Sequence, residues 1–436
     1  MTRGLVIAAP ASGCGKTVVT LALLRALRQA GMRVGSLKVG PDYIDPGFHR
    51  AASGGPCRNY DVWAMRPATL DRQLAAVATD TDLVLAEGVT GLFDGAADGT
   101  GSTAAAAARL GWPVVLVADA TGQGASVAAL VEGFDRHRAD TRIAGVILNR
   151  VGSDRHRDIL RAALAGTGVP VVGMIPRDPC LALPDRHLGL VQAAETSDLD
   201  RWIDRAADTI AEVLDRRTVL SLATETNLPA EDDGTPPLPP PGQRIAVADD
   251  AAFSFTYPHV LDGWRATGAE IDPFSPLADE APTQDADAVY LPGGYPELHA
   301  GRLAACGNFL AGLRDAAARD AVIYGECGGF MVLGRSLIDR DGQAHGMAGL
   351  LPVETSFADP RLHLGYRKIS LRGASFLGTT GAAFRGHEFH YSSRIGERSC
   401  EALFDATDAT GAHADSAGCR QGKVMGSYLH LIDRAD

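Results

Sequence analysis

The sequence predicts an α/β protein with two domains, each built on a parallel sheet covered by helices. Two observations predict this fold class. Short apolar segments alternate with helical patterns along most of the chain, as strands joined by crossover helices do. A proline-rich stretch interrupts the alternation, and the 436 residues are too many for one typical core. We therefore expect a first domain at 1–226, a linker at 227–243 and a second domain at 244–436.

Composition and charge exclude several classes of protein. A formal net charge of −12 disfavours general binding to nucleic acid or to an anionic membrane. The amino-terminal segment has no apolar core followed by a cleavage site, and no later run is long and uncharged enough to span a bilayer. We therefore expect a cytoplasmic protein. The seven cysteines are odd in number and form no CxxC pair, so neither a disulfide framework nor a zinc site is expected.

The first domain begins with a phosphate-binding motif at residues 9–17, between an apolar strand and a helical pattern. Its glycines let the backbone approach a polyphosphate, its lysine reaches the β- and γ-phosphates, and its threonine hydroxyl can bind Mg²⁺. Pro10 stands where the usual motif has its first glycine, so the loop must begin differently. A plain glycine-rich turn is the alternative. The residues expected in these roles are Gly13, Gly15, Lys16 and Thr17.

Two further strands of this domain end in carboxylates. The segment ending at Val39 runs into a loop that carries Asp42 and Asp45, and another segment ends directly before Glu87. Parallel strands present their carboxyl ends at one edge of a sheet, next to the phosphate turn. We therefore expect Glu87 and one of the two aspartates, with Asp42 the second candidate, to hold Mg²⁺ beside Thr17. The alternative is that the aspartates only cap the turn.

The remaining β-α alternation completes the first domain. Asn149 follows one of its apolar segments, and its amide has the donor and acceptor needed to read the edge of an adenine. From the residues alone, a helix-entry role is equally compatible. The expected strands lie at 5–8, 33–39, 83–86, 114–118, 143–148 and 171–175, with helical stretches at 18–30, 104–110 and 155–165.

A cysteine stands at a tight strand-to-helix turn in the second domain, within Gly325-Glu326-Cys327-Gly328-Gly329. The flanking glycines permit strained backbone angles, and the helix N-terminus favours a thiolate and supplies amides, such as that of Gly328, to an oxyanion. A second glycine turn upstream offers another oxyanion donor, assigned to Gly294. The expected base is His430, at the end of a short strand over 426–430.

The segment His387-Glu388-Phe389-His390 is a rival site in the same domain. Its spacing differs from the helical HExxH metal pattern, and its surroundings alternate like a strand. A structural or substrate-facing role for the two histidines is therefore favoured over metal binding. For Cys327, the corresponding alternative is a buried structural cysteine.

Together these motifs resemble the a,c-diamide synthases of cobyrinic or hydrogenobyrinic acid, in the wider cobyric acid synthase family. The first domain resembles dethiobiotin synthetase through residues 12–17, 38–46 and Glu87-Gly88. The second resembles the class I glutamine amidotransferases through residues 291–298 and 325–329, together with His430. The resemblance covers the whole chain, and the 38–46 segment and the Gly-Gly-Tyr-Pro-Glu stretch are specific to this family.

The resemblance implies an ATP- and glutamine-dependent ligase of cobalamin biosynthesis that amidates the a and c carboxylates of a corrinoid. Cys327 would form a thioester with glutamine, and His430 would transfer protons. Many class I amidotransferases have Glu where this chain has Ile432, so either Asp433 orients the imidazole or the site works as a dyad. The residues implied to serve MgATP are Lys16, Thr17, Asp45 and Glu87, with Asn149 at the adenine.

Ammonia does not displace oxide from a carboxylate, so the ATP-binding domain is expected to form an acyl phosphate first. The expected partners are glutamine and a corrinoid polycarboxylate, and the chain is expected to form a homodimer. Binding to nucleic acid or to a membrane is not expected. A cobyric acid synthase acting on other corrinoid carboxylates is the nearest alternative. Two alternatives belong to other classes of protein. One is an inactive binding module, and the other is a partitioning-type ATPase. Such ATPases carry a signature lysine where this chain has Ala11.

Overall fold

The structure is a computed structural model that describes every residue except 1, 184, 187–188, 191, 197, 215, 228–233, 397–399 and 436. The chain divides into two compact units. The first comprises Met1–Trp63 and Leu70–Asp232, and the second comprises Ala64–Thr69 and Asp233–Asp436. The α/β class and the two-part organisation predicted from the sequence are both present.

The first unit is a parallel sheet with strand order β3-β2-β4-β1-β5-β6-β7; the short strand β10 lies outside this order and pairs antiparallel with the first two residues of β1. The order places β1 in the middle, and its side chains from Leu5 to Ala8 are fully buried. The strands are β1 (Arg3–Ala8), β2 (Val34–Val39), β3 (Cys57–Tyr60), β4 (Leu83–Glu87), β5 (Val114–Asp119), β6 (Ile143–Val151), β7 (Val171–Pro176) and β10 (Thr224–Glu225); β8 (Asp185–Arg186) and β9 (Gly189–Leu190) form a separate pair.

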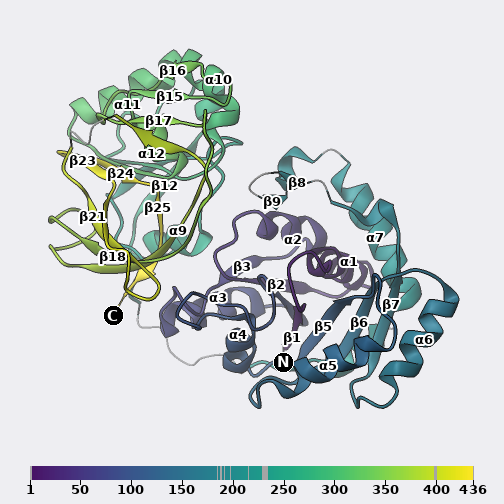
Figure 1. The fold of residues 1–436 in the computed structure, drawn as a ribbon. Helices are drawn as coiled ribbons and strands as arrows, with labels where there is room; N and C mark the ends of the chain where they lie inside the picture. Colours follow the sequence, from purple (N-terminus) through teal and green to yellow (C-terminus); the bar gives the residue numbers. More distant parts are fainter. Residues whose placement is uncertain are drawn as a thin grey trace. The chain divides into compact units, whose positions relative to one another are not determined.

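Helices cover both faces of this sheet (Figure 1). Helices α1, α2 and α7 lie on one face and α3 to α6 on the other, as right-handed crossovers require when the chain moves first to one side of β1 and later to the other. Their bounds are α1 (Lys16–Gln29), α2 (Asp45–Ser53), α3 (Pro67–Ala78), α4 (Thr103–Leu110), α5 (Ser126–Arg136), α6 (Asp154–Leu164), α7 (Leu199–Val213) and α8 (Arg216–Leu222).

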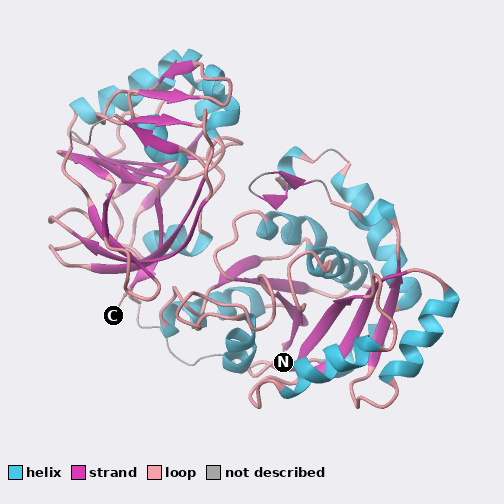
Figure 2. Cartoon of the chain, viewed as in Figure 1, coloured by secondary structure: helices cyan, strands magenta, loops and turns pink. Residues whose placement is uncertain are grey.

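The second unit contains three sheets, of which the sequence predicted only the mostly parallel one (Figure 2). That sheet has the order β12-β11-β13-β14-β24-β23, with β11 (Arg244–Ala248), β12 (Glu270–Phe274), β13 (Ala288–Leu291), β14 (Val322–Glu326), β23 (Cys419–Gln421) and β24 (Val424–Ser427). Its helices are α9 (Pro258–Ala266), α10 (Ala300–Ala305), α11 (Gly307–Ala318) and α12 (Gly328–Leu333).

The two additional sheets lie between α12 and the end of the chain in sequence. One has the order β16-β15-β17-β20 and the other β22-β21-β18-β19-β25. Their strands are β15 (Ser336–Ile338), β16 (Ala344–Gly346), β17 (Glu354–Ser356), β18 (His363–Leu371), β19 (Ala383–His390), β20 (Ser393–Ile395), β21 (Phe404–Asp408), β22 (Asp415–Ala417) and β25 (Leu429–Arg434).

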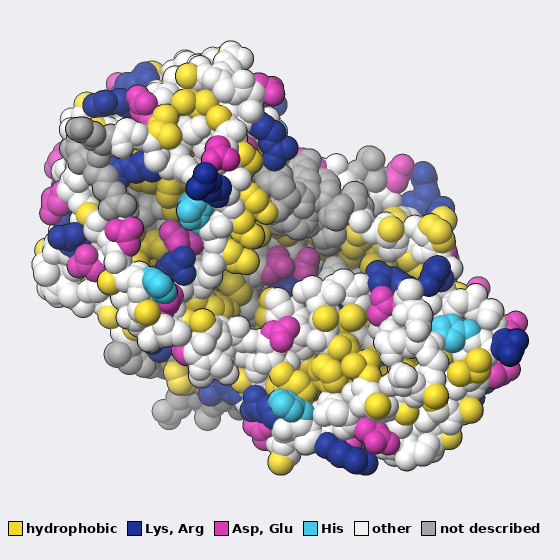
Figure 3. All heavy atoms as spheres, in the orientation of Figure 1, with side chains coloured by type: hydrophobic (Ala, Val, Ile, Leu, Met, Phe, Trp, Pro, Cys, Tyr) yellow, Lys and Arg dark blue, Asp and Glu magenta, His cyan; other side chains and the backbone are white. Residues whose placement is uncertain are grey.

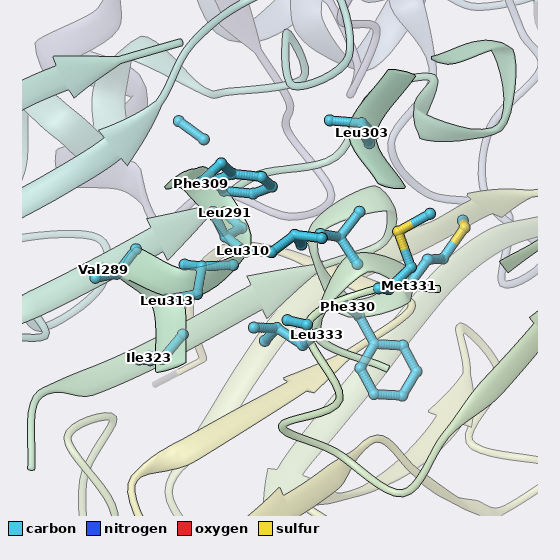
Figure 4. Packing of buried hydrophobic residues seen from close by; sticks show 14 of the residues in the cluster. Val289, Leu291, Leu303, Phe309, Leu310, Leu313, Ile323, Phe330, Met331 and Leu333 are labelled. Carbon is cyan, nitrogen blue, oxygen red and sulfur yellow. The ribbon is translucent and has the colours of Figure 1, made fainter. Parts of the chain in front are cut away.

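Apolar packing fixes the short helix α12 against the mostly parallel sheet. Phe330, Met331 and Leu333 of α12 are buried with Leu291 of β13 and Ile323 of β14 (Figure 4). Leu310 and Leu313 of α11 belong to the same cluster. A six-residue helix has little stability of its own, so this packing holds the residues at its N-terminus in place.

Three expectations from the sequence need comment. Cys400 and Cys419 form a disulfide, which the cysteine pattern did not lead us to expect. The predicted strand over 426–430 is in fact two strands, β24 and β25, in two different sheets, because the chain passes from one sheet to the other at Tyr428. The predicted linker at 227–243 lies partly outside the described residues; in its described part, Leu238 is buried and accepts a hydrogen bond from Trp264.

Two properties of the described residues bear on binding to charged partners and to membranes. On the face drawn in Figure 3, basic and acidic side chains of the described residues are interspersed. No helix in the described parts of the chain is long and apolar enough to cross a membrane.

Candidate active sites

The phosphate-binding motif forms a tight turn between β1 and α1. Gly13 and Gly15 have φ angles of 79° and 95°, in the left-handed region that favours glycine. A Cβ atom on Gly15 would lie 2.2 Å from the Asn149 Nδ2 atom, so only glycine fits there. Helix α1 then begins at Lys16, which leaves its first amides and the positive end of its dipole at the turn.

Lys16 and Asn149 both contact carbonyl groups around this turn. The Lys16 Nζ atom donates to the carbonyl of Thr90 at 2.6 Å, and burial followed by the charge of Lys38 lowers the pKa of its ammonium. Asn149 Nδ2 donates to the Cys14 carbonyl at 2.9 Å, and its Oδ1 accepts from the Arg150 amide. In this structure the Asn149 side chain therefore braces the turn, and its role at the adenine stays a prediction.

A buried polar cluster lies at the carboxyl ends of β2 and β4. Thr17 Oγ1 donates to Glu87 Oε1 at 2.6 Å. Lys38 Nζ lies 3.0 Å from the same Glu87 oxygen and 2.5 Å from Asp45 Oδ2. His49 Nε2 lies 2.6 Å from the other Glu87 oxygen. Thr17, Asp45 and Glu87, which the sequence assigned to one site, are thus brought together.

The two aspartates of the loop after β2 have different roles. Asp42 Oδ1 accepts hydrogen bonds from the amides of Ile44 and Asp45, at 2.7 and 3.0 Å, and so caps the turn into α2. Asp45 is buried and faces Lys38. The turn-capping alternative therefore describes Asp42, whereas Asp45 belongs to the cluster.

Sequence reasoning gave no role to Lys38 or His49, although both contact the carboxylates. Two signals were available: Lys38 is a cation between Leu37 and Val39 in an expected strand, and His49 follows Asp45 by four residues, which places both on one face of α2. Burial alone would lower the pKa of the Lys38 ammonium, but Asp45 and Glu87 outweigh it and raise the pKa. Burial and then Asp42 raise the pKa of Asp45 to about 7.

The oxygen donors of this cluster suit a divalent cation. Thr17 Oγ1 and Glu87 Oε1 are close enough to share one coordination sphere, and hydroxyl and carboxylate oxygens are the ligands Mg²⁺ prefers. Within the described residues, however, no three His, Cys, Asp or Glu side chains form a metal-binding group. In this structure the Lys38 ammonium is the positive charge beside Asp45 and Glu87.

The second site centres on Cys327, between β14 and α12. Its φ and ψ angles are 46° and −102°, a strained conformation for a residue with a Cβ atom. Its amide donates to the Ser427 carbonyl at 2.8 Å, which ties the strained turn to β24. The side chain is buried, and Sγ lies 3.8 Å from the carbonyl oxygen of Phe389 in β19. This is the geometry of a nucleophile held at a sharp strand-to-helix turn.

Close glycine contacts bring the predicted residues of this site together. A Cβ atom on Gly293 would lie 2.5 Å from His430 Cε1 and 3.3 Å from Cys327 Cβ. A Cβ atom on Gly328 would lie 3.1 Å from the Gly294 amide nitrogen. The two predicted oxyanion donors, Gly294 and Gly328, are therefore neighbours beside the nucleophile.

Burial shifts the pKa of the predicted base and that of the predicted nucleophile in the directions that favour their neutral forms. His430 is completely buried in β25, opposite His387 of β19, and the two rings stack with centroids 4.9 Å apart. Burial, followed by the charge of His387, lowers the pKa of the His430 imidazole. Burial, followed by the charge of Glu297, raises the pKa of the Cys327 thiol. Burial therefore opposes the thiolate that the helix N-terminus was expected to favour.

Asp433 does not face the imidazole in the way its sequence position suggested. Its carboxylate accepts hydrogen bonds from the Arg66 amide at 2.8 Å and from Arg66 Nε at 3.0 Å, and both residues belong to the second unit. A different carboxyl group, that of Glu326, has its Oε2 atom 4.0 Å from His430 Nδ1. The sequence indicated no role for Glu326.

A cavity of 490 Å³ lies on one face of the sheet that contains β18 and β19. Arg367 and Glu388 form an ion pair at 2.6 Å in its wall. Phe330, three residues after the cysteine, and Tyr428, two residues before His430, also line it. Burial would raise the pKa of the Glu388 carboxyl, but His390 and Arg367 outweigh it and lower the pKa to about 2.

The rival histidine pair lies in β19, as its alternating pattern predicted. His387 Nε2 lies 2.9 Å from the Tyr257 hydroxyl, and burial lowers the pKa of its imidazole to about 4. His390 Nδ1 lies 2.9 Å from the Ser392 carbonyl oxygen. Both histidines are therefore held by contacts within the protein.

The fold and the two sites define a class of enzyme that joins a P-loop nucleotide-binding unit to a glutamine amidotransferase unit. Family comparisons support each half. Residues 5–191 match the CobQ/CobB/MinD/ParA nucleotide binding domain, and residues 244–436 match the CobB/CobQ-like glutamine amidotransferase domain.

Similarity to curated proteins extends over the whole chain. The chain is 54% identical to the hydrogenobyrinate a,c-diamide synthase of Rhizobium meliloti (strain 1021), over 99% of each protein. It is 53% identical to the Brucella anthropi protein of the same name, over 99% of this chain and 98% of that protein. The chain therefore belongs to the hydrogenobyrinate a,c-diamide synthase family, and the resemblance drawn from its motifs is confirmed.

Proposed function

We propose that the chain uses ATP and glutamine to convert the a and c carboxylates of hydrogenobyrinate, the cobalt-free corrinoid, into amides. The observation that carries this proposal is the presence of both sites in one chain that is 54% identical to a named synthase over 99% of its length. Lys16 and the carboxylate cluster suit activation of an acid, and Cys327 with His430 suits release of ammonia.

In the amidotransferase unit, Cys327 Sγ attacks the side-chain carbonyl carbon of glutamine. Because the thiol is neutral, its proton passes to the neutral imidazole of His430 as the carbon–sulfur bond forms. The amides of Gly294 and Gly328 stabilise the oxyanion. The imidazolium then gives the proton to the departing ammonia, and water hydrolyses the thioester to glutamate. The cavity beside Arg367 and Glu388 is proposed to hold the charged amino and carboxylate groups of glutamine.

In the nucleotide-binding unit, a corrinoid carboxylate attacks the γ-phosphorus of ATP and forms an acyl phosphate. Lys16 and the α1 amides stabilise the charge on the transferring phosphoryl group, and ammonia then displaces phosphate. Mg²⁺ fits the donor set of Thr17, Asp45 and Glu87 and would supply further positive charge beside the phosphates. Asn149 is proposed to contact the adenine. We also propose that the chain forms a homodimer and acts in the cytoplasm.

The test is product analysis with purified protein. Hydrogenobyrinate and cobyrinate are incubated side by side with ATP, Mg²⁺ and ¹⁵N-amide glutamine, and the labelled nitrogens per product molecule are counted by mass spectrometry. Two labels, dependent on ATP, support an a,c-diamide synthase. Four labels indicate a cobyric acid synthase. ATP hydrolysis without label transfer would contradict both and favour a partitioning-type ATPase, which the amidotransferase match already argues against.

A further inference from the structure

Glu326 is a buried carboxyl group directly before the nucleophile. It is the last residue of β14, and its side chain is almost completely enclosed. Tyr324 donates its hydroxyl to Glu326 Oε1 at 2.9 Å, and Tyr290 donates to Oε2 at 3.0 Å. Since the two tyrosines are register partners in β14 and β13, the sheet itself places both donors on the carboxylate.

The same carboxylate also contacts the strand that carries the base. The Leu431 amide, one residue after His430, donates to Glu326 Oε1 at 3.2 Å. Glu326 Oε2 lies 4.0 Å from His430 Nδ1. Glu326 thus directly precedes Cys327 in the chain, and its carboxylate accepts a hydrogen bond from the backbone of β25 next to His430.

An imidazole that accepts a proton at Nε2 needs an acceptor for its Nδ1–H. That acceptor fixes the tautomer and stabilises the buried imidazolium that forms. Ile432, at the position where many amidotransferases have Glu, is apolar, and the Asp433 carboxylate binds Arg66. The distance from Glu326 to Nδ1 is about 1 Å longer than a hydrogen bond, and catalytic hydrogen bonds are often long before substrate binds.

We propose that Glu326 is the positioning residue of the amidotransferase site, whose carboxylate accepts the Nδ1–H of His430 as the imidazole takes the Cys327 proton. This inference rests on the glutamine-dependent step of the proposed function. Glu326 neither gains nor loses a proton: the thiol proton moves to Nε2 and then to ammonia, while the carbon–sulfur bond forms and the carbon–nitrogen bond breaks. The tyrosine hydroxyls keep the carboxylate aimed at the imidazole.

The test compares Glu326→Gln with Tyr324→Phe, a matched variant that removes one donor to the same carboxylate. Glutaminase kcat and KM are measured, with ammonium-supported amidation as the control for an intact chain. For Glu326→Gln we expect kcat to fall about 100-fold, with KM for glutamine and the ammonium reaction unchanged. For Tyr324→Phe we expect a smaller loss in kcat.

A Glu326→Gln kcat within about twofold of the unsubstituted enzyme would overturn the assignment. If Glu326→Gln also loses the ammonium reaction, Glu326→Asp decides the question, because it keeps the negative charge and shortens the reach to Nδ1. A folded Asp variant should lose kcat, and an unchanged kcat would equally reject the inference. Failure of the unsubstituted chain to hydrolyse glutamine at all would instead contradict the proposed function.

Discussion

Asp433 accepts two hydrogen bonds from Arg66, one from its backbone amide and one from its guanidinium, and thereby joins residues 64–69 to β25. The Asp433 side chain is fully buried. The ion pair therefore gives a structural reason for an acidic residue at this position, which the sequence offered, beside a Cys-His dyad, as one way to orient the imidazole.

Replacing Arg66 by Ala should destabilise the fold and leave the chemistry of the folded enzyme intact. The substitution leaves the Asp433 carboxylate buried without its guanidinium, a change that costs about 3 kcal/mol. Urea unfolding and glutaminase kcat per folded molecule give the two readouts. Arg265→Ala, which removes an exposed ion pair with Asp262 in the same unit, is the matched control and should cost under about 1 kcal/mol. A selective loss of kcat in Arg66→Ala would restore a catalytic role for Asp433.

Lys16→Ala should abolish both amidations and leave glutaminase activity unchanged. The chain carries one P-loop, so we expect a single synthetase site to act on the two carboxylates in turn. Mass spectrometry of the corrinoid, together with glutamate release, measures the two activities separately. A product that still carries one amide would show that the carboxylates are activated independently.

Cys327→Ala should remove the use of glutamine while ammonium salts still support amidation. The alanine variant lacks the sulfur that forms the thioester, but the nucleotide-binding residues are untouched. The measurement is corrinoid amidation with each nitrogen source. Cys306→Ala, at a buried cysteine of the same unit, is the control and should keep both activities. Loss of the ammonium reaction in a folded Cys327→Ala variant would argue against separate roles for the two units.

The chemistry of Cys327 should depend on pH as a buried thiol, not as a thiolate. Because burial raises the thiol pKa, alkylation by iodoacetamide should be slow at neutral pH and accelerate as the pH rises beyond the range of an ordinary cysteine. Because burial lowers the His430 pKa, the imidazole stays neutral when the pH falls through 6.5, the ordinary histidine value, and glutaminase activity should persist there.

Peptide-level mass spectrometry separates Cys327 from the exposed Cys180, which serves as the internal reference. An alkylation rate for Cys327 at pH 7 that equals or exceeds that of Cys180 would show that the pKa of the Cys327 thiol is not raised. An acid limb of glutaminase activity centred near 6.5 would show that His430 titrates normally.

Arg367→Ala should raise the KM for glutamine and change kcat little. The substitution removes the cation from the wall of the cavity and leaves Glu388 without its arginine partner, whereas Cys327 and His430 keep their contacts. Glutaminase kinetics check this, and the ammonium reaction should be unaffected. Arg361→Ala, at an exposed arginine paired with Asp359, is the control. An unchanged KM would place the glutamine head group elsewhere.

Local motifs were predictable because their geometry is encoded within a few consecutive residues. Gly13, Gly15 and Lys16 lie in a strand–turn–helix unit that needs no distant partner to be recognised. The same holds for Cys327, whose neighbour Gly329 permits the close approach of β13.

Contacts between distant segments were not predictable. Lys38 contacts Glu87 because β2 and β4 are neighbours in the sheet. The residues of neither strand indicate which strand it pairs with. Asp433 lies three residues after His430 in the sequence and was therefore a candidate to orient its imidazole. In the folded chain its carboxylate forms an ion pair with Arg66 instead. The disulfide between Cys400 and Cys419 depends likewise on two segments meeting, which cysteine counting does not reveal.

The left-handed backbone of Cys327 has a consequence for how this protein can change over time. A residue with a Cβ atom at φ 46° is strained by about 1 to 3 kcal/mol, and glycine at the same position is not. Glycine would therefore relax the turn and abolish the nucleophile in a single step. Selection for a more heat-resistant fold and selection for ammonia release oppose each other at residue 327, and a lineage that no longer needed glutamine would be expected to lose this cysteine early.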